Sequence, residues 1–386
     1  MTFEWRLYVR DASYQRRGEI RDYTSATLSP VYNDVGTWSI TLDRDSPMAP
    51  YLTTPGWGII ATRNDIAMIS GITTNIRHVV STDENHMEIS GSTDEIWLQS
   101  RLVSPSPGES SAPYTAQAVD VRTGPASTVI IGYVNANLGP GAVSTRRKAG
   151  FTMAADPVIG ASVRGEGRWD ADLLTFIQPM AQTANVGFRV TQVGAGLQFQ
   201  VYAPADRSAT VKFSVALGNL SAFEYTSSRP RANYVFVGAS GTGTARIIKE
   251  FPDSTAIATW ERIEGPLANQ GSSSDSTAIA QAGADALAQN SEQASLTITP
   301  LEKPNMMYGI DYAIGDKVTV QLEGPAQTPY AESGQIVDLL RQVTITLSKD
   351  EQTVTPTIGT PAKGTIPRLI RAFQQHARRI NNLERT

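Results

Sequence analysis

The sequence predicts a mainly β protein in which a small α+β unit separates two β-rich regions and a helix follows at the C-terminus. Three observations support this prediction. Short runs of β-branched and aromatic residues, broken by Asp, Asn, Gly or Pro, fill residues 3 to about 100 and return after about residue 211. Helical spacing of apolar residues is confined to a few segments. The 31 Gly and 22 Pro among 386 residues suit many short strands joined by turns.

Residues 1–108 form the first predicted β unit. Its runs are "EWRLYV", "WSITL", "GIIATR", "AMISGITTNI" and "HMEIS". Their spacing predicts a small barrel or a sandwich. The stretch "SPSPGESSAP" at 104–113 then marks a boundary, because Pro, Gly and Ser cluster there.

Residues 109–210 form the predicted α+β unit. "PASTVIIGYVNANLGPG" predicts a helix that ends at Gly139. "RWDADLLTFIQPMAQTANVGFRV" predicts a second helix, with Asp170 as its N-terminal cap and a kink at Pro179. "VGFRVTQVGAGLQFQVYAP" predicts a hairpin that turns at residues 194–196.

Residues 211–350 form the second predicted β unit, with one inserted helix. The strands are predicted at "SLTITPL", "DKVTVQL" and "LLRQVTITL". The inserted helix is predicted at 272–293, where a Ser- and Asp-rich start precedes an Ala-rich stretch. Residues 351–365 are rich in Thr, Pro and Gly and predict a linker.

Residues 366–386 predict an amphipathic helix. Its apolar stripe has heptad spacing, interrupted by the polar His376. The stripe consists of Ile366, Leu369, Phe373, Ile380 and Leu383. One interpretation is a trimeric coiled coil, in which these five residues mediate oligomerisation. The other is a helix docked on its own domain, since short stripes of this kind serve both purposes.

Bulk composition narrows the classes of function. The formal net charge is −4, and the last 21 residues alone carry five Arg and one Glu. A basic tail on an acidic body is not the basic face expected of a duplex-binding protein. The absence of cysteine excludes disulfides, thiolate metal sites and cysteine nucleophiles. No apolar run approaches the roughly 20 residues of a membrane span, and the N-terminus lacks a signal-peptide pattern, so assembly in a cytoplasm is expected.

The stretch "NYVFVGASGTGTARIIKE" at 233–250 resembles a phosphate-binding loop in one dimension. Gly238 and Gly243 have the separation of a Walker loop, but Thr244 and Ala245 stand where Lys and a hydroxyl residue are needed. Arg246 stands where a dinucleotide fingerprint needs its third glycine. The residues that follow favour a strand, whereas both motifs need a helix N-terminus. The stretch therefore predicts a glycine-rich hairpin loop and no cofactor.

The histidines and carboxylates predict no catalytic and no metal site. His78 and His86 flank a turn, where Asp83 or Glu84 could join them in binding a metal; a solvated turn is the alternative. "TDE" at 93–95 and "GEGRWDAD" at 165–172 supply carboxylates, but no spacing identifies an acid–base pair.

The six tryptophans are evenly spread along the chain, at Trp5, Trp38, Trp57, Trp97, Trp169 and Trp260. They suit core or interface anchors, or a sugar-stacking face.

Several weak sequence motifs occur in an order that resembles a known protein family. "NDVGTWSITLDRDSP", "MISGIT" and "MEISGSTDEIWLQSRLVSP" resemble the opening barrel of minor tail proteins from siphophages of actinobacteria. "RWDADLLTFIQPMAQTANVGFRV" resembles their central unit. "SRPRANYVFVGASGTGTARII", "YGIDYAIGDKVTVQL" and "QIVDLLRQVTITL" resemble their second half. The resemblance covers nearly the whole chain.

This resemblance implies a structural hub at the virion's tail tip, similar to the baseplate hub of contractile phages. Such hubs contain two β-barrel domains per chain. A homotrimer then matches the sixfold tail tube above and a threefold fibre or spike below, and phage DNA passes through the channel without specific binding. The partners are other tail proteins and, indirectly, the host envelope. The alternatives are a receptor- or carbohydrate-binding tail protein and a cell-wall hydrolase.

Overall fold

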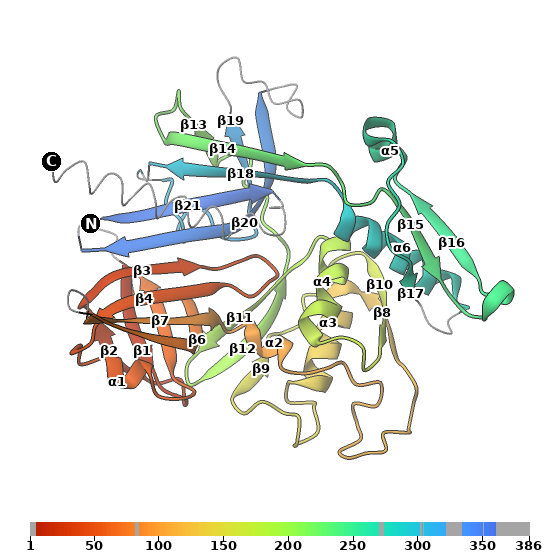
Figure 1. The fold of residues 1–386 in the computed structure, drawn as a ribbon, viewed down its shortest axis with the longest axis horizontal. Helices are drawn as coiled ribbons and strands as arrows, with labels where there is room; N and C mark the ends of the chain where they lie inside the picture. The colour runs from red at the N-terminus through yellow and green to blue at the C-terminus, as the bar shows by residue number, and fades with distance from the viewer. Residues whose placement is uncertain are drawn as a thin grey trace.

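The computed structural model describes residues 5–81, 85–269, 274–301, 303, 305–321, 334–349 and 351–359. The predicted helix at 366–386 lies outside these ranges, and with it Ile366, Leu369, Phe373, Ile380 and Leu383. The prediction of a mainly β protein with a small α+β part is confirmed (Figure 1). Within the described ranges, no helix is both long enough and apolar enough to cross a membrane.

The first β unit is an antiparallel sheet. Its strands are β1 (Trp5–Arg10), β2 (Arg16–Ile20), β3 (Tyr23–Ser29), β4 (Thr37–Asp43), β5 (Gly58–Arg63), β6 (Ile66–Val80) and β7 (Asn85–Thr93). They lie in the order β3-β4-β7-β6-β5-β1-β2, with the short helices α1 (Ala49–Leu52) and α2 (Ile96–Gln99) beside them. Alternation explains the burial: in β4, Trp38, Ile40 and Leu42 point into the core.

The α+β unit packs two helices against short sheets. Its elements are β8 (Asp120–Pro125), α3 (Ala126–Asn137), β9 (Phe151–Met153), β10 (Ser162–Gly167), α4 (Leu173–Thr183), β11 (Gly187–Val193) and β12 (Gly196–Tyr202). The predicted hairpin is confirmed, since Val193 pairs with Gly196. The predicted cap is wrong: Asp172, not Asp170, accepts a 2.9 Å hydrogen bond from the Thr175 N–H. Asp172 directly precedes the first helical residue, where a side-chain oxygen reaches the free N–H groups.

The second β unit contains β13 (Lys212–Ser214), β14 (Leu220–Ser228), β18 (Gln293–Pro300), β19 (Lys317–Gln321), β20 (Gln335–Ser348) and β21 (Gln352–Gly359). The linker predicted from residue 351 is wrong over β21, which pairs with both β18 and β20. Val354, Pro356 and Ile358 are buried at alternate positions in β21. This period of two is a strand signal that the Thr and Pro content obscured.

The two β units share one sheet. β20 pairs with β3, so the strand path runs β14-β18-β21-β20-β3-β4-β7-β6-β5-β1-β2 (Figure 1). One hydrophobic cluster extends across both units, from Trp38 and Ile40 to Val343 and Ile345. The division of the chain at residues 108 and 210 stays a prediction.

The glycine-rich stretch belongs to a small separate sheet. β15 (Tyr234–Gly238) pairs with β16 (Ile248–Pro252) and β17 (Ala268–Asn269). α6 (Ser276–Asn290), the predicted inserted helix, packs against it through Ile279, while α5 (Ser254–Trp260) follows β16. The hairpin predicted at 233–250 thus lies in a sheet of its own, separate from the main sheet of the second β unit.

Candidate functional site

The two β units repeat the same five-strand arrangement. The order β3-β4-β7-β6-β5 in the first unit matches β14-β18-β21-β20-β19 in the second. In each unit a long strand, β6 or β20, pairs with the preceding strand over its first part and with the following strand over its later part. The candidate assembly surfaces follow from this repeat.

The long hairpins of the two units have the same register. In each hairpin, one residue of the longer strand forms a bulge and lies opposite no residue of the other strand. This skipped residue is Thr74 in β6 and Arg341 in β20. The skipped residue lies the same number of residues before the turn, which closes at Val80–Asn85 in one hairpin and at Leu347–Gln352 in the other. The flanking pairs are Thr73–Gly91 and Asn75–Ser90 in the first hairpin, and Leu340–Ile358 and Gln342–Thr357 in the second.

The outer strands give the same correspondence independently. β3 skips Thr24 against β4, and β14 skips Ser221 against β18. At equal distances beyond these bulges lie the pairs Leu28–Trp38 and Tyr225–Leu296. Trp38 then pairs onward with Gly91, and Leu296 with Ile358. Bulges at matching positions make the repeat a property of the backbone, although the equivalent residues differ.

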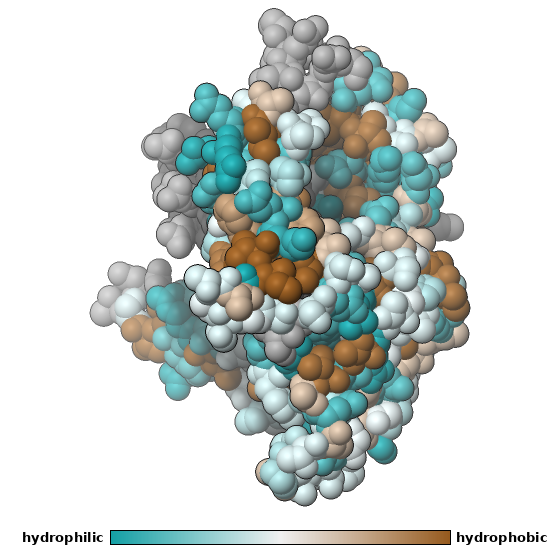
Figure 2. All heavy atoms as spheres, turned by 90° about the vertical axis from the view of Figure 1, so that its right-hand side faces the viewer, coloured by the Kyte–Doolittle hydropathy of each residue, from teal (hydrophilic) through white to brown (hydrophobic). Residues whose placement is uncertain are grey.

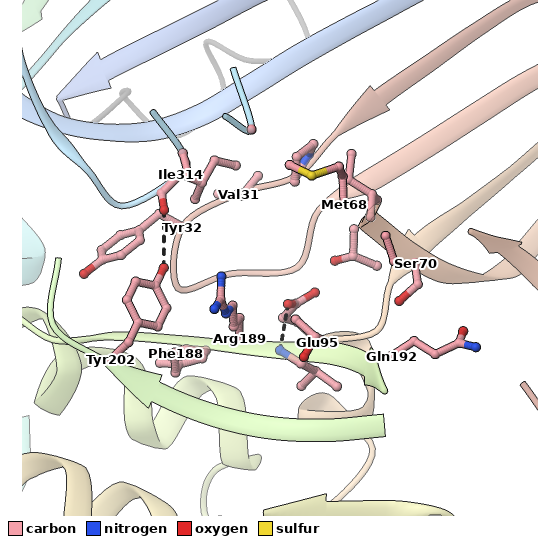
Figure 3. Close-up of a pocket in the computed structure, with 18 of the residues that line it drawn as sticks. Val31, Tyr32, Met68, Ser70, Glu95, Phe188, Arg189, Gln192, Tyr202 and Ile314 are labelled. Atoms are coloured by element: carbon pink, nitrogen blue, oxygen red, sulfur yellow. Dashed lines mark hydrogen bonds between the residues drawn. The ribbon is translucent and has the colours of Figure 1, made fainter. Parts of the chain in front are cut away.

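A cavity of about 500 Å³ lies where the first β unit, the β11–β12 hairpin and the segment 308–314 meet. Figure 3 shows its lining, with Tyr32 and Tyr202 at one end and Glu95 and Gln192 at the other. The Glu95 carboxylate accepts a 3.0 Å hydrogen bond from the Val190 N–H. Burial raises the pKa of Glu95 to about 7, against the lowering effect of this bond and of the Thr93 hydroxyl.

Beside this cavity, a buried ion pair within the first β unit also contacts the α+β unit. The Arg10 guanidinium donates to both carboxylate oxygens of Asp94, at 2.8 and 2.5 Å. Ser70 Oγ donates to the same carboxylate at 2.6 Å, and Arg10 reaches Gln192 Oε1 in β11 at 3.0 Å. The side chains of Arg10 and Asp94 are 1% and 0% exposed. Asp94 is therefore a structural group in a satisfied network.

A second contact reinforces this attachment. Asn33 Nδ2 donates to the Val186 carbonyl at 2.9 Å, and Asn33 Oδ1 accepts from the Phe188 N–H at 2.7 Å. Gln178 Nε2 donates to the Asn33 carbonyl at 3.0 Å. These bonds fix β11 and α4 on the loop between β3 and β4, so the polar groups here join parts of the chain.

A second cavity of about 470 Å³ lies between the α+β unit and α6. Arg164 forms an ion pair with Asp275 at 3.2 Å, and the Thr183 hydroxyl donates to Asp285 at 2.8 Å. Burial raises the pKa of Asp285. α6 thus carries the β15–β17 sheet onto the α+β unit through polar contacts.

The structure separates the residues that were considered for metal binding. His78 lies opposite Met87 in the β6–β7 hairpin, and His86 lies opposite Val79. His86 Nε2 is 3.5 Å from Glu88 Oε1, while Asp83 and Glu84 lie outside the described residues. Among the residues that the structure describes, no three His, Cys, Asp or Glu side chains gather as a metal site would require.

The remaining sequence candidates have structural contacts. β15 ends at Gly238 and β16 returns beside it, which confirms the predicted hairpin. Glu166 is engaged by Arg164 and Arg168. Trp38 is in the core, whereas Trp169 is 41% exposed beside Tyr114. Motif spacing did not indicate the register of the repeat or the Arg10–Asp94 pair, because both depend on contacts between distant residues.

Comparison with known proteins identifies the family. A family model described as siphovirus ReqiPepy6 Gp37-like protein matches residues 6–360. The chain belongs to this siphovirus protein family. No curated protein sequence matches it.

Solved structures of phage tail proteins show the same fold. The 43 kDa tail protein of prophage MuSo2 from Shewanella oneidensis has a TM-score of 0.56 at 12% identity, with 92% of this chain and 98% of that chain covered. Prophage tail protein gp18 from Listeria monocytogenes EGD-e has a TM-score of 0.55 at 8% identity, with 96% and 98% covered. The tail protein from Neisseria meningitidis MC58 has a TM-score of 0.53 at 12% identity, with 93% and 97% covered. The predicted resemblance to siphophage tail proteins is thus confirmed.

Proposed function

We propose that this chain is a structural, non-enzymatic hub at the tip of a siphophage tail. Three copies form a ring that joins the sixfold tail tube to a threefold fibre or spike, and the ring lines the channel through which DNA leaves. The observation that carries the proposal is the backbone repeat of the two β units. Three copies of a chain with two equivalent β units present six equivalent β units, which is the number needed to match a sixfold tube.

The surface of the chain suits contacts with several neighbours. Figure 2 shows separate apolar patches among polar side chains on the side of the molecule that includes the β15–β17 sheet. Ile247, Ile248 and Leu267 are among the exposed apolar residues of this part of the chain. Patches of this kind on a large protein mark contacts with other proteins. The channel role needs no specific DNA contact, in keeping with the net charge of −4.

A receptor- or carbohydrate-binding tail protein is the second candidate. Trp169 and Tyr114 form an edge-on aromatic pair with ring centroids 5.2 Å apart. The Arg146 guanidinium lies 5.4 Å from the Trp169 ring centroid, so part of the ring is already in contact within the chain. A sugar-binding role predicts chemical-shift changes at Trp169 when cell-wall oligosaccharide is titrated, whereas the hub role predicts none.

Light scattering of the purified protein tests self-assembly. The hub predicts a concentration-dependent mass approaching three times the 41.6 kDa of the chain. A chain that stays monomeric at every concentration would count against self-assembly as an intrinsic property. Cell-wall hydrolysis assayed in the same preparation tests the enzymatic alternative, and measurable turnover would contradict a purely structural role.

A further inference from the structure

The joint between the two β units is an antiparallel pair of strand edges. Beyond the part of β20 that pairs with β19, Thr346 lies opposite Thr27 of β3, and Leu347 lies opposite Ala26. β3 uses its other edge for β4, and β20 uses its other edge for β21. The joint thus connects the late part of the long strand of one unit to the outer strand of the other unit.

Because the two β units repeat, an equivalent pair of strand edges exists on β6 and β14. By the register of the hairpins, Val79 and Val80 of β6 correspond to Thr346 and Leu347. By the bulges of the outer strands, Phe223 and Glu224 of β14 correspond to Ala26 and Thr27. Among the described strands, β6 pairs only with β7 at Val79 and Val80, and β14 pairs only with β18.

Two apolar side chains on the β6 edge are exposed where their counterparts on β20 are buried. Val80 is 66% exposed and Ile76 is 39% exposed, whereas the equivalent Leu347 and Val343 are 0% exposed. A long strand edge with exposed apolar residues is a template for pairing with another chain.

The partner edge supplies complementary chemistry. Phe223 is partly buried against the shared core and would face Val80 in the transferred register. Glu224 is exposed on β14 and would lie diagonally across from Arg77 of β6. Arg77 now contacts Glu88 of its own hairpin at 2.7 Å, in a pair that is exposed at both side chains. The two edges therefore match in apolar contact and in charge.

We propose that the end of β6 pairs antiparallel with β14 of a second copy of this chain, with Val79 opposite Glu224 and Val80 opposite Phe223. This joint repeats the β20–β3 joint between chains, so that the sheet continues from each copy to the next. The contact is heterologous and closes into a ring when the copies are related by rotation. Only the number of copies in the ring rests on the proposed hub function.

The absence of cysteine makes disulfide trapping a direct test. The double variant Val79→Cys/Glu224→Cys places one sulfur on each edge in the proposed register. The matched control is Val79→Cys/Thr226→Cys, which shifts the second cysteine by two residues on the same face of β14. The variant Thr27→Cys/Thr346→Cys reproduces the observed joint within one chain and shows that the geometry permits a disulfide. Opposed residues in a sheet lie about 5 Å apart, within the range that a disulfide spans.

The proposal predicts covalent dimers and trimers for the 79/224 variant after mild oxidation. It predicts about tenfold less cross-linked product for the 79/226 control, because a diagonal separation of about 7–8 Å exceeds the reach of a disulfide. Equal cross-linking of both variants, or none for 79/224, would overturn the proposal. Light scattering of the reduced variants separates it from the hub: trimers that do not cross-link refute this joint alone, whereas persistent monomers also count against self-assembly of the hub.

Discussion

Leu347 of β20 lies opposite Ala26 of β3, and the two side chains are 0% and 1% exposed. Through this pairing β3, the outer strand of the first β unit, becomes an inner strand of the larger sheet. The two units that sequence reasoning treated as separate are therefore joined by hydrogen bonds and by a common core. The equivalent position in the first unit is Val80, which is 66% exposed.

A charged side chain at position 347 should affect folding, whereas a charged side chain at position 80 should affect assembly. Leu347→Asp is expected to lower the free energy of unfolding by more than about 3 kcal/mol, because it places an unpaired carboxylate in the core. Val80→Lys is expected to change the stability of the chain by less than about 0.5 kcal/mol, and to weaken self-assembly because lysine protects strand edges. Urea unfolding and light scattering measure the two effects. The control Ile66→Lys is on the same strand at a 62% exposed position and should leave assembly unchanged.

Removing one member of the Arg10–Asp94 ion pair should lower the free energy of unfolding more than replacing both residues by apolar ones. Arg10→Met leaves a buried carboxylate without its cation, and a loss of about 3–5 kcal/mol in the free energy of unfolding is expected. The double variant Arg10→Met/Asp94→Leu should recover most of this loss, since it removes both charges. The comparison variant is Arg77→Met, in the exposed pair with Glu88, where less than about 1 kcal/mol is expected. A double variant no more stable than Arg10→Met would contradict this interpretation.

Gly91 should not tolerate a side chain. A Cβ at this position would lie 2.0 Å from the Ile72 carbonyl oxygen and 2.4 Å from ring atoms of Trp38. Because both neighbours are fixed in the core, Gly91→Ala is expected to lower the free energy of unfolding by about 1–3 kcal/mol. Gly108→Ala is the matched control, since a Cβ there meets no atom within 4 Å. Similar melting temperatures for the two variants would argue against close packing of Trp38 on the sheet.

Glu95 should make stability depend on pH. Burial raises its pKa from 4.5 to about 7, so the folded chain retains a proton that the unfolded chain loses between these values. The free energy of unfolding should therefore fall as pH rises through this window and level off above it. Glu95→Gln should remove this part of the decline. Glu88→Gln should not, because the hydrogen bond from Arg77 lowers the pKa of Glu88. An unchanged pH profile in Glu95→Gln would contradict the assignment.

The predicted C-terminal heptads can be tested apart from the described fold. If residues 366–386 form an axial bundle in the trimer, Phe373→Asp or Ile380→Asp should weaken assembly or fibre attachment and leave the β units folded. Light scattering reports the first effect, and circular dichroism reports the second. Assembly that is unchanged by both substitutions would remove the coiled-coil interpretation.

The sequence predicted the helices and strands better than the contacts between them. Start and end signals together with apolar spacing located α3, α4 and α6, and the β-branched residues after Gly243 predicted the strand that became β16. The β21 strand was missed because Thr and Pro dominate it, although Val354 and Ile358 have strand periodicity. The cap of α4 was misplaced by two residues, between two aspartates in one short stretch.

The resemblance implied two similar β units, but the register of the repeat and the joints could not be predicted from one sequence. Trp38 and Leu296 occupy equivalent positions without sharing size or shape, so the correspondence exists only in the backbone register. Arg10 and Asp94 are far apart in the chain and meet within the first β unit, and Gln192 joins them only when the α+β unit packs on the first sheet. Such contacts depend on topology, which local periodicity does not encode.

Cryo-electron microscopy of the intact siphophage tail tip tests the central claim most directly. The hub account predicts three copies of this chain in one ring, whose six β units surround the channel with equivalent spacing below the tail tube. A single copy at the tip, a ring in which the two β units of each chain occupy different radii, or a position away from the channel would contradict it.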